Sequence, residues 1–225
     1  DGIRDRDVTG VQTCALPICM LPRPPRLRYT GGMTRLDFVK LHGLGNDFVI
    51  VDGNRLSVDF RGELGRTLCD RHTGIGADGV LVWTGPAQSP TMTVINADGS
   101  VAGMCGNGLR CFVKYMLDRH VEGSHLTVAT GNGPLDCQAQ RGAEGRVERV
   151  RIGMGTPTWQ FVDEPLADVR VTALSLGNPH AVTFAPLSTS ERETLGPQLC
   201  HHPRFPDQAN VGFARIDGPK DRKST

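Results

Sequence analysis

The sequence lacks several features that would point to whole classes of protein. It has only 2 Trp and 2 Tyr in 225 residues, no Cys-x-x-Cys pair, and no apolar run of membrane-spanning length. A zinc site is therefore poorly supported, and no transmembrane helix is expected. A net charge of +1 without a basic stripe makes nucleic acid an unexpected partner. The 28 glycines instead indicate many tight turns, as in a turn-rich α/β enzyme.

Cysteine usage indicates a reducing compartment. The seven cysteines are Cys14, Cys19, Cys69, Cys105, Cys111, Cys137 and Cys200. Their number is odd and their spacing irregular, and the sequence has no Asn-x-Ser/Thr sequon. Reduced thiols in the cytoplasm are the simpler interpretation.

Both ends of the chain differ from the patterned middle. Residues 1–32 combine a charged run, a short apolar stretch broken by Pro17 and a segment rich in Pro and Arg. A signal peptide needs a longer apolar core. We therefore expect 1–32 to be a disordered, non-native leader with Met33 as the native start, and 218–225 to be a disordered tail.

Short strands dominate the patterned part. Strands are predicted at 36–40, 48–51, 80–83, 92–95, 126–129, 135–138, 147–152, 169–176, 181–184 and 211–216. Helices are predicted at 57–69, after Cys105, and at 191–199, the last broken by Gly196-Pro197. This pattern favours an α+β fold with mixed or antiparallel sheets over a doubly wound parallel sheet.

Cys105 is the strongest candidate for a reactive residue. It precedes Gly106-Asn107-Gly108, and the apolar residues Leu109, Phe112, Val113, Met116 and Leu117 then follow at helical spacing. A thiol at a helix start meets unpaired N–H groups and the positive end of the dipole, which favours the reactive thiolate. The same N–H groups form an anion site suited to a carboxylate. The alternative is a buried structural cysteine; the Gly-Asn-Gly segment favours the reactive one.

One glycine-rich segment imitates a dinucleotide-binding motif. Gly74 to Gly79 fits G-x-G-x-x-G. The fingerprint must follow a strand and open a helix, whereas here a predicted helix precedes and a predicted strand follows. A helix-to-strand turn explains the glycines better.

Asparagines recur next to glycine or proline at predicted strand ends. They are Asn46, Asn96, Asn107 and Asn178, with Asn210 as a further case. Asparagine offers donors and an acceptor without charge, so such a set suits a small zwitterion bound without metal. For any single one of them, an ordinary turn residue is the favoured interpretation.

Several segments, in order from about Leu36 to Ile216, resemble the diaminopimelate epimerase family. They are Leu41 to Phe48, Asp70 to Gly79, Asn96 to Cys111, Ala129-Thr130-Gly131, Met154-Gly155, Gly177-Asn178-Pro179-His180 and Asn210-Val211. The resemblance implies two pseudo-symmetric domains, each a mixed or antiparallel sheet wrapped around a central helix. We place the N-terminal domain at 33–149 and a partial C-terminal domain at 150–217.

The resemblance also implies an activity: cofactor-independent interconversion of LL- and meso-diaminopimelate, for lysine and peptidoglycan precursor synthesis. One cysteine thiolate removes the α-proton and a second cysteine returns a proton to the opposite face. Residue by residue, Cys105 matches the first catalytic cysteine and His180 a histidine beside the catalytic centre, with a structural turn histidine as the alternative. Gly106 and Asn107, and Asn46, Asn96, Asn178 and Asn210, match substrate contacts. Neither a cofactor nor a metal is implied.

Two departures from the family pattern affect these expectations. Gly79 stands where some members carry glutamine. The Ala-Cys-Gly-Thr-Gly segment that carries the second cysteine does not follow Ile216. We therefore expect the printed chain to be inactive or nearly so, with an incomplete second domain.

Two other functions stay open. A related racemase of the proline racemase type also uses paired cysteines, and a non-catalytic amino-acid-binding fragment is the other alternative. In either case the expected partner is a small molecule rather than nucleic acid or membrane, and the expected assembly is a homodimer.

Overall fold

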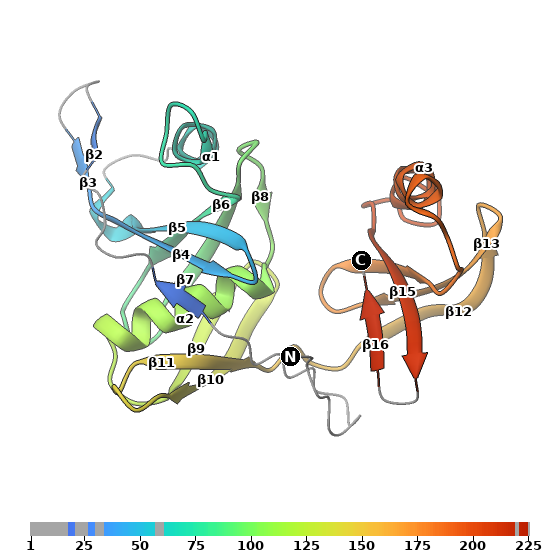
Figure 1. The fold of residues 1–225 in the computed structure, drawn as a ribbon. Helices are drawn as coiled ribbons and strands as arrows, with labels where there is room; N and C mark the ends of the chain where they lie inside the picture. Colours follow the sequence, from blue (N-terminus) through green and yellow to red (C-terminus); the bar gives the residue numbers. More distant parts are fainter. Residues whose placement is uncertain (1–17, 21–26, 30–33, 57–60, 219–220, 225) are drawn as a thin grey trace. The chain divides into compact units, whose positions relative to one another are not determined.

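The computed structural model describes residues 18–20, 27–29, 34–56, 61–218 and 221–224. The chain divides into two compact units, Asp1–Met154 and Gly155–Thr225, here called unit 1 and unit 2 (Figure 1). Each combines a sheet of mostly antiparallel strands with few helices, which confirms the predicted α+β class.

Unit 1 is built on a nine-stranded sheet in the order β1-β4-β5-β6-β7-β9-β10-β11, with β8 paired to β7. Its strands are β1 (Ile18–Met20), β4 (Phe38–Gly43), β5 (Asn46–Asp52), β6 (Gly79–Thr84), β7 (Thr91–Asn96), β8 (Val101–Ala102), β9 (His125–Thr130), β10 (Gly133–Arg141) and β11 (Val147–Ile152). Two pairs, β5–β6 and β7–β9, are parallel and the others are antiparallel. A separate hairpin joins β2 (Leu27–Tyr29) and β3 (Thr34–Leu36). The helices are η1 (Gly53–Arg55), α1 (Arg61–Cys69) and α2 (Gly106–Arg119).

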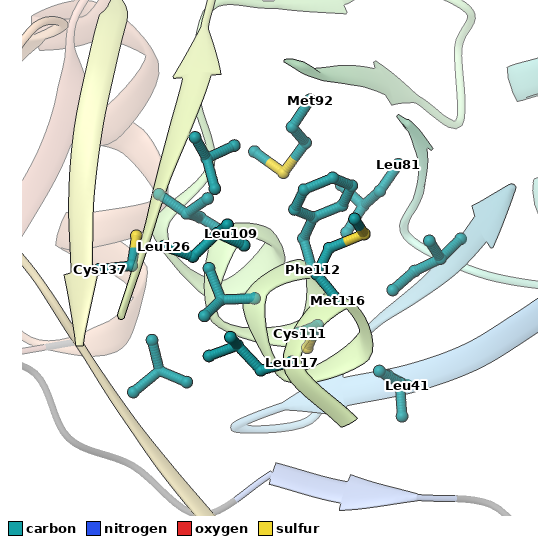
Figure 2. Packing of buried hydrophobic residues seen from close by; sticks show 14 of the residues in the cluster. Leu41, Leu81, Met92, Leu109, Cys111, Phe112, Met116, Leu117, Leu126 and Cys137 are labelled. Atoms are coloured by element: carbon teal, nitrogen blue, oxygen red, sulfur yellow. The ribbon is translucent and has the colours of Figure 1, made fainter. Parts of the chain in front are cut away.

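The sheet of unit 1 curls around α2. This helix contacts strands near both ends of the sheet order, β4 and β11, as well as β5, β7, β9 and β10 between them. Its predicted apolar residues Leu109, Phe112, Val113, Met116 and Leu117 are all buried in one core cluster. Figure 2 shows four of them, Leu109, Phe112, Met116 and Leu117, together with Leu41, Leu81, Met92 and Leu126 from the sheet. Because the helix is enclosed on several sides, Arg110, Cys111 and Lys114 are buried as well.

Helix α1 packs against a second apolar cluster that the same strands supply. Along β5 the side chains alternate: Phe48 and Ile50 join the α2 cluster, whereas Val49 and Val51 join the α1 cluster. Both sets are buried, so this strand is covered on both faces. That explains why it appears in the sequence as a continuous apolar run instead of an alternating one.

Unit 2 contains a five-stranded sheet in the order β12-β13-β14-β15-β16. Its elements are β12 (Thr158–Leu166), β13 (Val169–Ser175), β14 (Pro179–Thr183), α3 (Thr189–Cys200), β15 (Asn210–Gly218) and β16 (Asp221–Ser224). The parallel pair β14–β15 is connected through α3, as β5–β6 is connected through α1. In both units the parallel pair follows an antiparallel pairing and precedes another. The strand order of unit 2 therefore repeats part of unit 1, and α3 takes the place of α1 in that order.

Two local predictions were wrong. The strands predicted at 36–40 and 48–51 extend further towards each other than predicted, because β4 continues to Gly43 and β5 begins at Asn46. A two-residue turn at Leu44 and Gly45 joins them. Both turn residues have positive φ, 58° and 82°, as a type I′ hairpin turn requires. Helix α3 also continues through Pro197, since a capping box of Ser188 and Glu191 starts it and its buried leucines hold it to the core.

Strands also form in three segments for which the sequence pattern did not predict them. In the expected leader, Ile18–Met20 pairs with β4 and Leu27–Tyr29 pairs with β3; the rest of 1–32 lies outside the described residues. In the expected tail, Asp221–Ser224 pairs with β15. Strand β12 was not predicted, because bulges between Trp159 and Glu164 interrupt its alternation. Backbone pairing to a neighbouring strand, which composition does not reveal, produces these strands.

Candidate functional site

Cys105 lies at the N-cap of α2, as its sequence context predicted. Its backbone is extended, its carbonyl accepts the Leu109 N–H at 2.8 Å, and its Sγ accepts the Gly108 N–H at 3.5 Å. The thiol is half-buried, and the first-turn N–H groups beside it have no partners within the helix. The position therefore combines an accessible sulfur with an anion-binding helix start.

The β4–β5 hairpin brings Asn46 to Cys105. A Cβ on Gly43 would lie 3.5 Å from the Asn107 carbonyl oxygen and 3.6 Å from the Cys111 Sγ, so the hairpin end approaches the first turns of α2 closely. Asn46 is paired with Gly43 across the turn, and its Oδ1 lies 4.0 Å from the Cys105 Sγ. The structure thus brings together two predicted residues that are 59 positions apart in the chain.

A network of charged groups lies behind Asn46: it binds the Nδ2 end of that side chain, while the Oδ1 end faces Cys105. Asp78 Oδ2 accepts the Asn46 Nδ2 at 2.8 Å and the Asp47 N–H at 2.9 Å, while its Oδ1 accepts Arg71 Nη2 at 2.9 Å. Arg71 also donates two hydrogen bonds to Asp47, and Lys40 lies 3.0 Å from Asp47 Oδ2. Burial by itself raises the pKa of Asp47, but hydrogen bonds from Arg71 and Lys40 outweigh it and hold that pKa below its usual range.

The first turn of α2 carries two more predicted residues. Asn107 Oδ1 accepts a hydrogen bond from Nη2 of the buried Arg110. A Cβ on Gly106 would meet only the Arg110 Nη1, at 3.9 Å, so Gly106 borders open space. On Gly108 it would lie 3.0 Å from a Leu81 methyl carbon, so that glycine serves helix-to-sheet packing. Of the two glycines, only Gly106 leaves room for a ligand.

Asn96 lies at the end of β7 in a turn of its own. Its Nδ2 donates to the Ser100 Oγ at 2.9 Å, and its backbone N–H donates to the Ser100 carbonyl at 2.9 Å. These bonds close the turn between β7 and β8. The structure accounts for Asn96 as a turn residue; its substrate contact stays a prediction.

The other three predicted residues lie together in unit 2. His180 Nε2 and Asn178 Oδ1 are 3.1 Å apart, and Asn210 Nδ2 donates to the Pro179 carbonyl at 3.2 Å. His180 and Asn210 are register partners in the parallel pair β14–β15. Burial lowers the pKa of His180, which favours the neutral imidazole. Parallel pairing thus assembles a small polar cluster from two segments distant in the chain.

Cys69, Cys111 and Cys137, also in unit 1, have buried side chains. Burial raises the pKa of Cys111 and of Cys137 to about 12, and that of Cys69 to about 11. Cys111 lies off the predicted apolar stripe of α2. It is buried in the core because the sheet surrounds α2. Cys200, in α3, is half-buried.

A cavity of about 300 Å³ lies beside the hairpin, lined by Lys40, Leu41, His42, Gly45, Asp47 and Arg71. None of the eight predicted site residues lines it. Its three charged residues, Lys40, Asp47 and Arg71, belong to the network behind Asn46.

Sequence reasoning missed Asp78 and Arg110, the two charged residues that bind the side chains of Asn46 and Asn107. Asp78 lies inside the glycine-rich turn, where the sequence pattern gave no individual role to the aspartate. Arg110 lies between apolar residues of a predicted helix. An arginine at such a position is normally expected to be exposed to solvent. An unexpected charge inside a buried helix was the available signal for Arg110.

In the part of the chain that the structure describes, no helix has the length and apolar character needed to span a membrane.

Comparison with known proteins identifies the family. Residues 38–160 match the family model described as "Diaminopimelate epimerase". The chain is 40% identical over 210 residues to a diaminopimelate epimerase of Pelotomaculum thermopropionicum, covering 84% of this chain and 74% of that protein. It is 37% identical over 199 residues to one of Methanothrix thermoacetophila, covering 82% and 71%.

Solved structures share the fold. A probable proline racemase from Agrobacterium radiobacter has a TM-score of 0.67 at 16% identity, covering 84% of this chain and 69% of that one. A hydroxyproline epimerase from Agrobacterium vitis has a TM-score of 0.67 at 14% identity, covering 84% and 68%. At these identities the likeness shows the fold alone.

Proposed function

Because the chain belongs to the diaminopimelate epimerase family, we propose that it acts in the interconversion of LL- and meso-diaminopimelate, with Cys105 as one of two cysteine bases. The relatives bear the name of that isomerase. The observation that carries the proposal for this chain is the Cys105 Sγ at the start of α2, bonded to the Gly108 N–H and facing Asn46.

Removal of the α-proton requires mainly the Cys105 thiolate and the N–H groups at the start of α2. The Cys105 thiolate takes the α-proton of the amino acid, so an S–H bond forms while the C–H electron pair stays on carbon. The resulting carbanion-like state places charge on the α-carboxylate, which N–H groups at a helix start can stabilise without reorganising. No cofactor is required for this step, and the substrate is a small zwitterion.

Inversion needs a second base on the opposite face of the α-carbon. In unit 1, Cys69, Cys111 and Cys137 are buried with raised pKa values, so none of these three serves as that base. The family's second cysteine segment is absent from the printed sequence. We therefore propose that the 225-residue chain epimerises slowly or not at all, while Cys105 still exchanges the α-proton.

Solvent exchange separates these two steps. The chain is incubated in deuterium oxide with LL- and, separately, meso-diaminopimelate, and deuterium at the α-carbon and inversion are followed by mass spectrometry and chiral chromatography. We expect exchange without equal inversion, and a loss of exchange of about 10²–10⁴-fold in Cys105→Ser, the range for removing a general base.

The matched control is Cys111→Ala, on the same helix, which should keep the exchange. Exchange that survives in Cys105→Ser would disprove the role of Cys105. Binding of diaminopimelate without any exchange would favour the non-catalytic binding fragment. The cytoplasmic location, the role in lysine and peptidoglycan precursor synthesis and the homodimer stay predictions.

A further inference from the structure

The network behind Asn46 has a consequence for Cys105. A carboxylate offers only acceptors, so the Asn46 atom that lies 2.8 Å from Asp78 Oδ2 is the NH2 group. The other end of the same amide, Oδ1, is then the atom that lies 4.0 Å from the Cys105 Sγ. Asp78 thereby determines which end of the Asn46 amide faces the thiol.

We propose that Asp78 is a positioning residue that acts on Cys105 through Asn46. By fixing the Asn46 amide, it keeps the acceptor oxygen of that amide next to the Cys105 sulfur. This oxygen stabilises the thiol form, whereas the N–H groups at the start of α2 stabilise the thiolate. The inference rests on the proposed role of Cys105 in proton transfer. Such a base must be able to hold a proton as well as release one. An acceptor on one side and the Gly108 N–H on the other support both states.

Asp78 is itself fixed well enough for this role. Its backbone N–H donates to the Asp47 carbonyl at 2.9 Å, which places it directly ahead of β6 beside β5. Its carboxylate accepts three donors: the Asn46 Nδ2, the Asp47 N–H and the Arg71 Nη2. With these bonds made, a flip of the Asn46 amide would put an oxygen against a carboxylate oxygen, which is repulsive.

Other ionisable groups around Cys105 must be distinguished from this effect. Arg110 and Cys111 belong to α2 itself, Asp47 to β5, and Arg71 to the turn after α1. Removing Asp78 deletes a negative charge as well as a hydrogen bond, and both changes favour the thiolate. The test must therefore separate amide orientation from charge.

The readout is the rate at which iodoacetamide modifies Cys105 at neutral pH in the full chain, resolved from other cysteines by peptide mass spectrometry. In Asp78→Ala the freed Asn46 amide can turn its NH2 group to the sulfur, and we expect alkylation about fivefold faster, the effect of one neutral hydrogen bond. Asn46→Ala should be faster by a similar factor. In the double variant the two effects should not multiply.

Asp78→Asn separates orientation from charge. It keeps an acceptor oxygen for the Asn46 NH2 group but has no charge, so its alkylation rate should stay close to that of the unmutated chain. Asp136→Ala is the matched control, because it removes a carboxylate of the same unit that bonds Thr127 instead of Asn46. Its rate should not change.

Three results would overturn the proposal: Asp78→Asn as fast as Asp78→Ala, multiplying effects in the double variant, or an unchanged rate in Asn46→Ala. If Asp78→Ala does not fold, Asp78→Asn and Asn46→Ala still decide. The α-proton exchange assay is independent of this readout. If the Asp78→Ala and Asn46→Ala effects on the alkylation rate do not multiply, but the chain does not exchange the α-proton, then the positioning role of Asp78 is supported and the proposed function is disproved.

Discussion

The start and the middle of α2 place the same side chain in opposite settings. Cys105, at the start, is half-buried and its sulfur accepts a backbone N–H. Cys111, six positions on, is fully buried among apolar side chains, and burial raises its pKa to about 12. Residue type is identical, so location on the helix and enclosure by the sheet decide which thiol can react.

The largest expected difference is in thiol reactivity. A pKa raised from 9.0 to about 12 leaves Cys111 about a thousandfold less thiolate than an ordinary thiol, since each step of one is a factor of ten. We expect iodoacetamide to modify Cys105 at least ~100-fold faster than Cys111 in the folded chain. Site-resolved mass spectrometry over time measures both rates. Equal alkylation rates of Cys105 and Cys111 in the folded chain would contradict the expected difference in reactivity. In denaturant the two rates should be equal, which serves as the internal control.

The buried middle of α2 should dominate the stability of unit 1. Phe112 is completely buried in the core around the helix. Phe112→Ala should lower the free energy of unfolding by about 3–5 kcal/mol, through lost transfer energy and a cavity. Urea unfolding followed by circular dichroism checks this. Phe184→Ala is the matched control, because Phe184 is 51% exposed, and a comparable loss there would contradict the reasoning.

Substitution of Cys105 and of Cys111 by serine should have opposite effects on stability and on α-proton exchange. Serine is a favoured N-cap, so Cys105→Ser should change the free energy of unfolding by less than about 0.5 kcal/mol while α-proton exchange is lost. Cys111→Ser buries a hydroxyl among apolar groups and should cost about 1–3 kcal/mol while exchange persists. Parallel unfolding and exchange measurements on both variants test this. If both variants lost α-proton exchange and were equally stable, the assignment of proton transfer to Cys105 and of core packing to Cys111 would be contradicted.

The smallest expected effect concerns acid stability of the network beside Cys105. The pKa of Asp47 is lowered in the folded chain, so its stabilising contribution is complete above its ordinary value of 3.8. It decreases as the pH falls below 3.8 and is lost completely only below the lowered folded-state pKa of Asp47. We expect a loss of only about 1 kcal/mol, because the Arg71 partner is largely exposed to solvent. Unfolding curves between pH 6 and 3 measure it. Asp47→Asn should weaken this dependence; an unchanged slope would show that Asp47 contributes nothing to it.

Much of unit 1 could be predicted because its local patterns agree with its tertiary structure. The helix after Cys105 and the strand 147–152 were located from periodicity and alternation, and the packing confirms both. The hairpin turn at Leu44 and the continuation of α3 through Pro197 were not found. In both cases the deciding contribution, a strand partner or a packed helix face, comes from residues outside the local window.

The candidate site shows the same division. Cys105 was identified because a helix start leaves a signature in a few consecutive residues. Asp78 and Arg110 were missed because their roles depend on side chains that only the folded chain brings near them. Asn96 illustrates the opposite: its sequence context matches the other asparagines, yet Ser100 accounts for its side chain.

The class of fold, the position of α2 and the prediction of Cys105 as a reactive residue could be obtained from the sequence, since they depend on spacing and chemistry within short segments. The burial of Cys111, the approach of Asn46 to the sulfur and the hydrogen bond from Asn46 to Asp78 depend on the folded chain. Burial and hydrogen-bond geometry are properties of neighbours in space. The curled sheet and the β4–β5 hairpin supply those neighbours from positions far away in the chain.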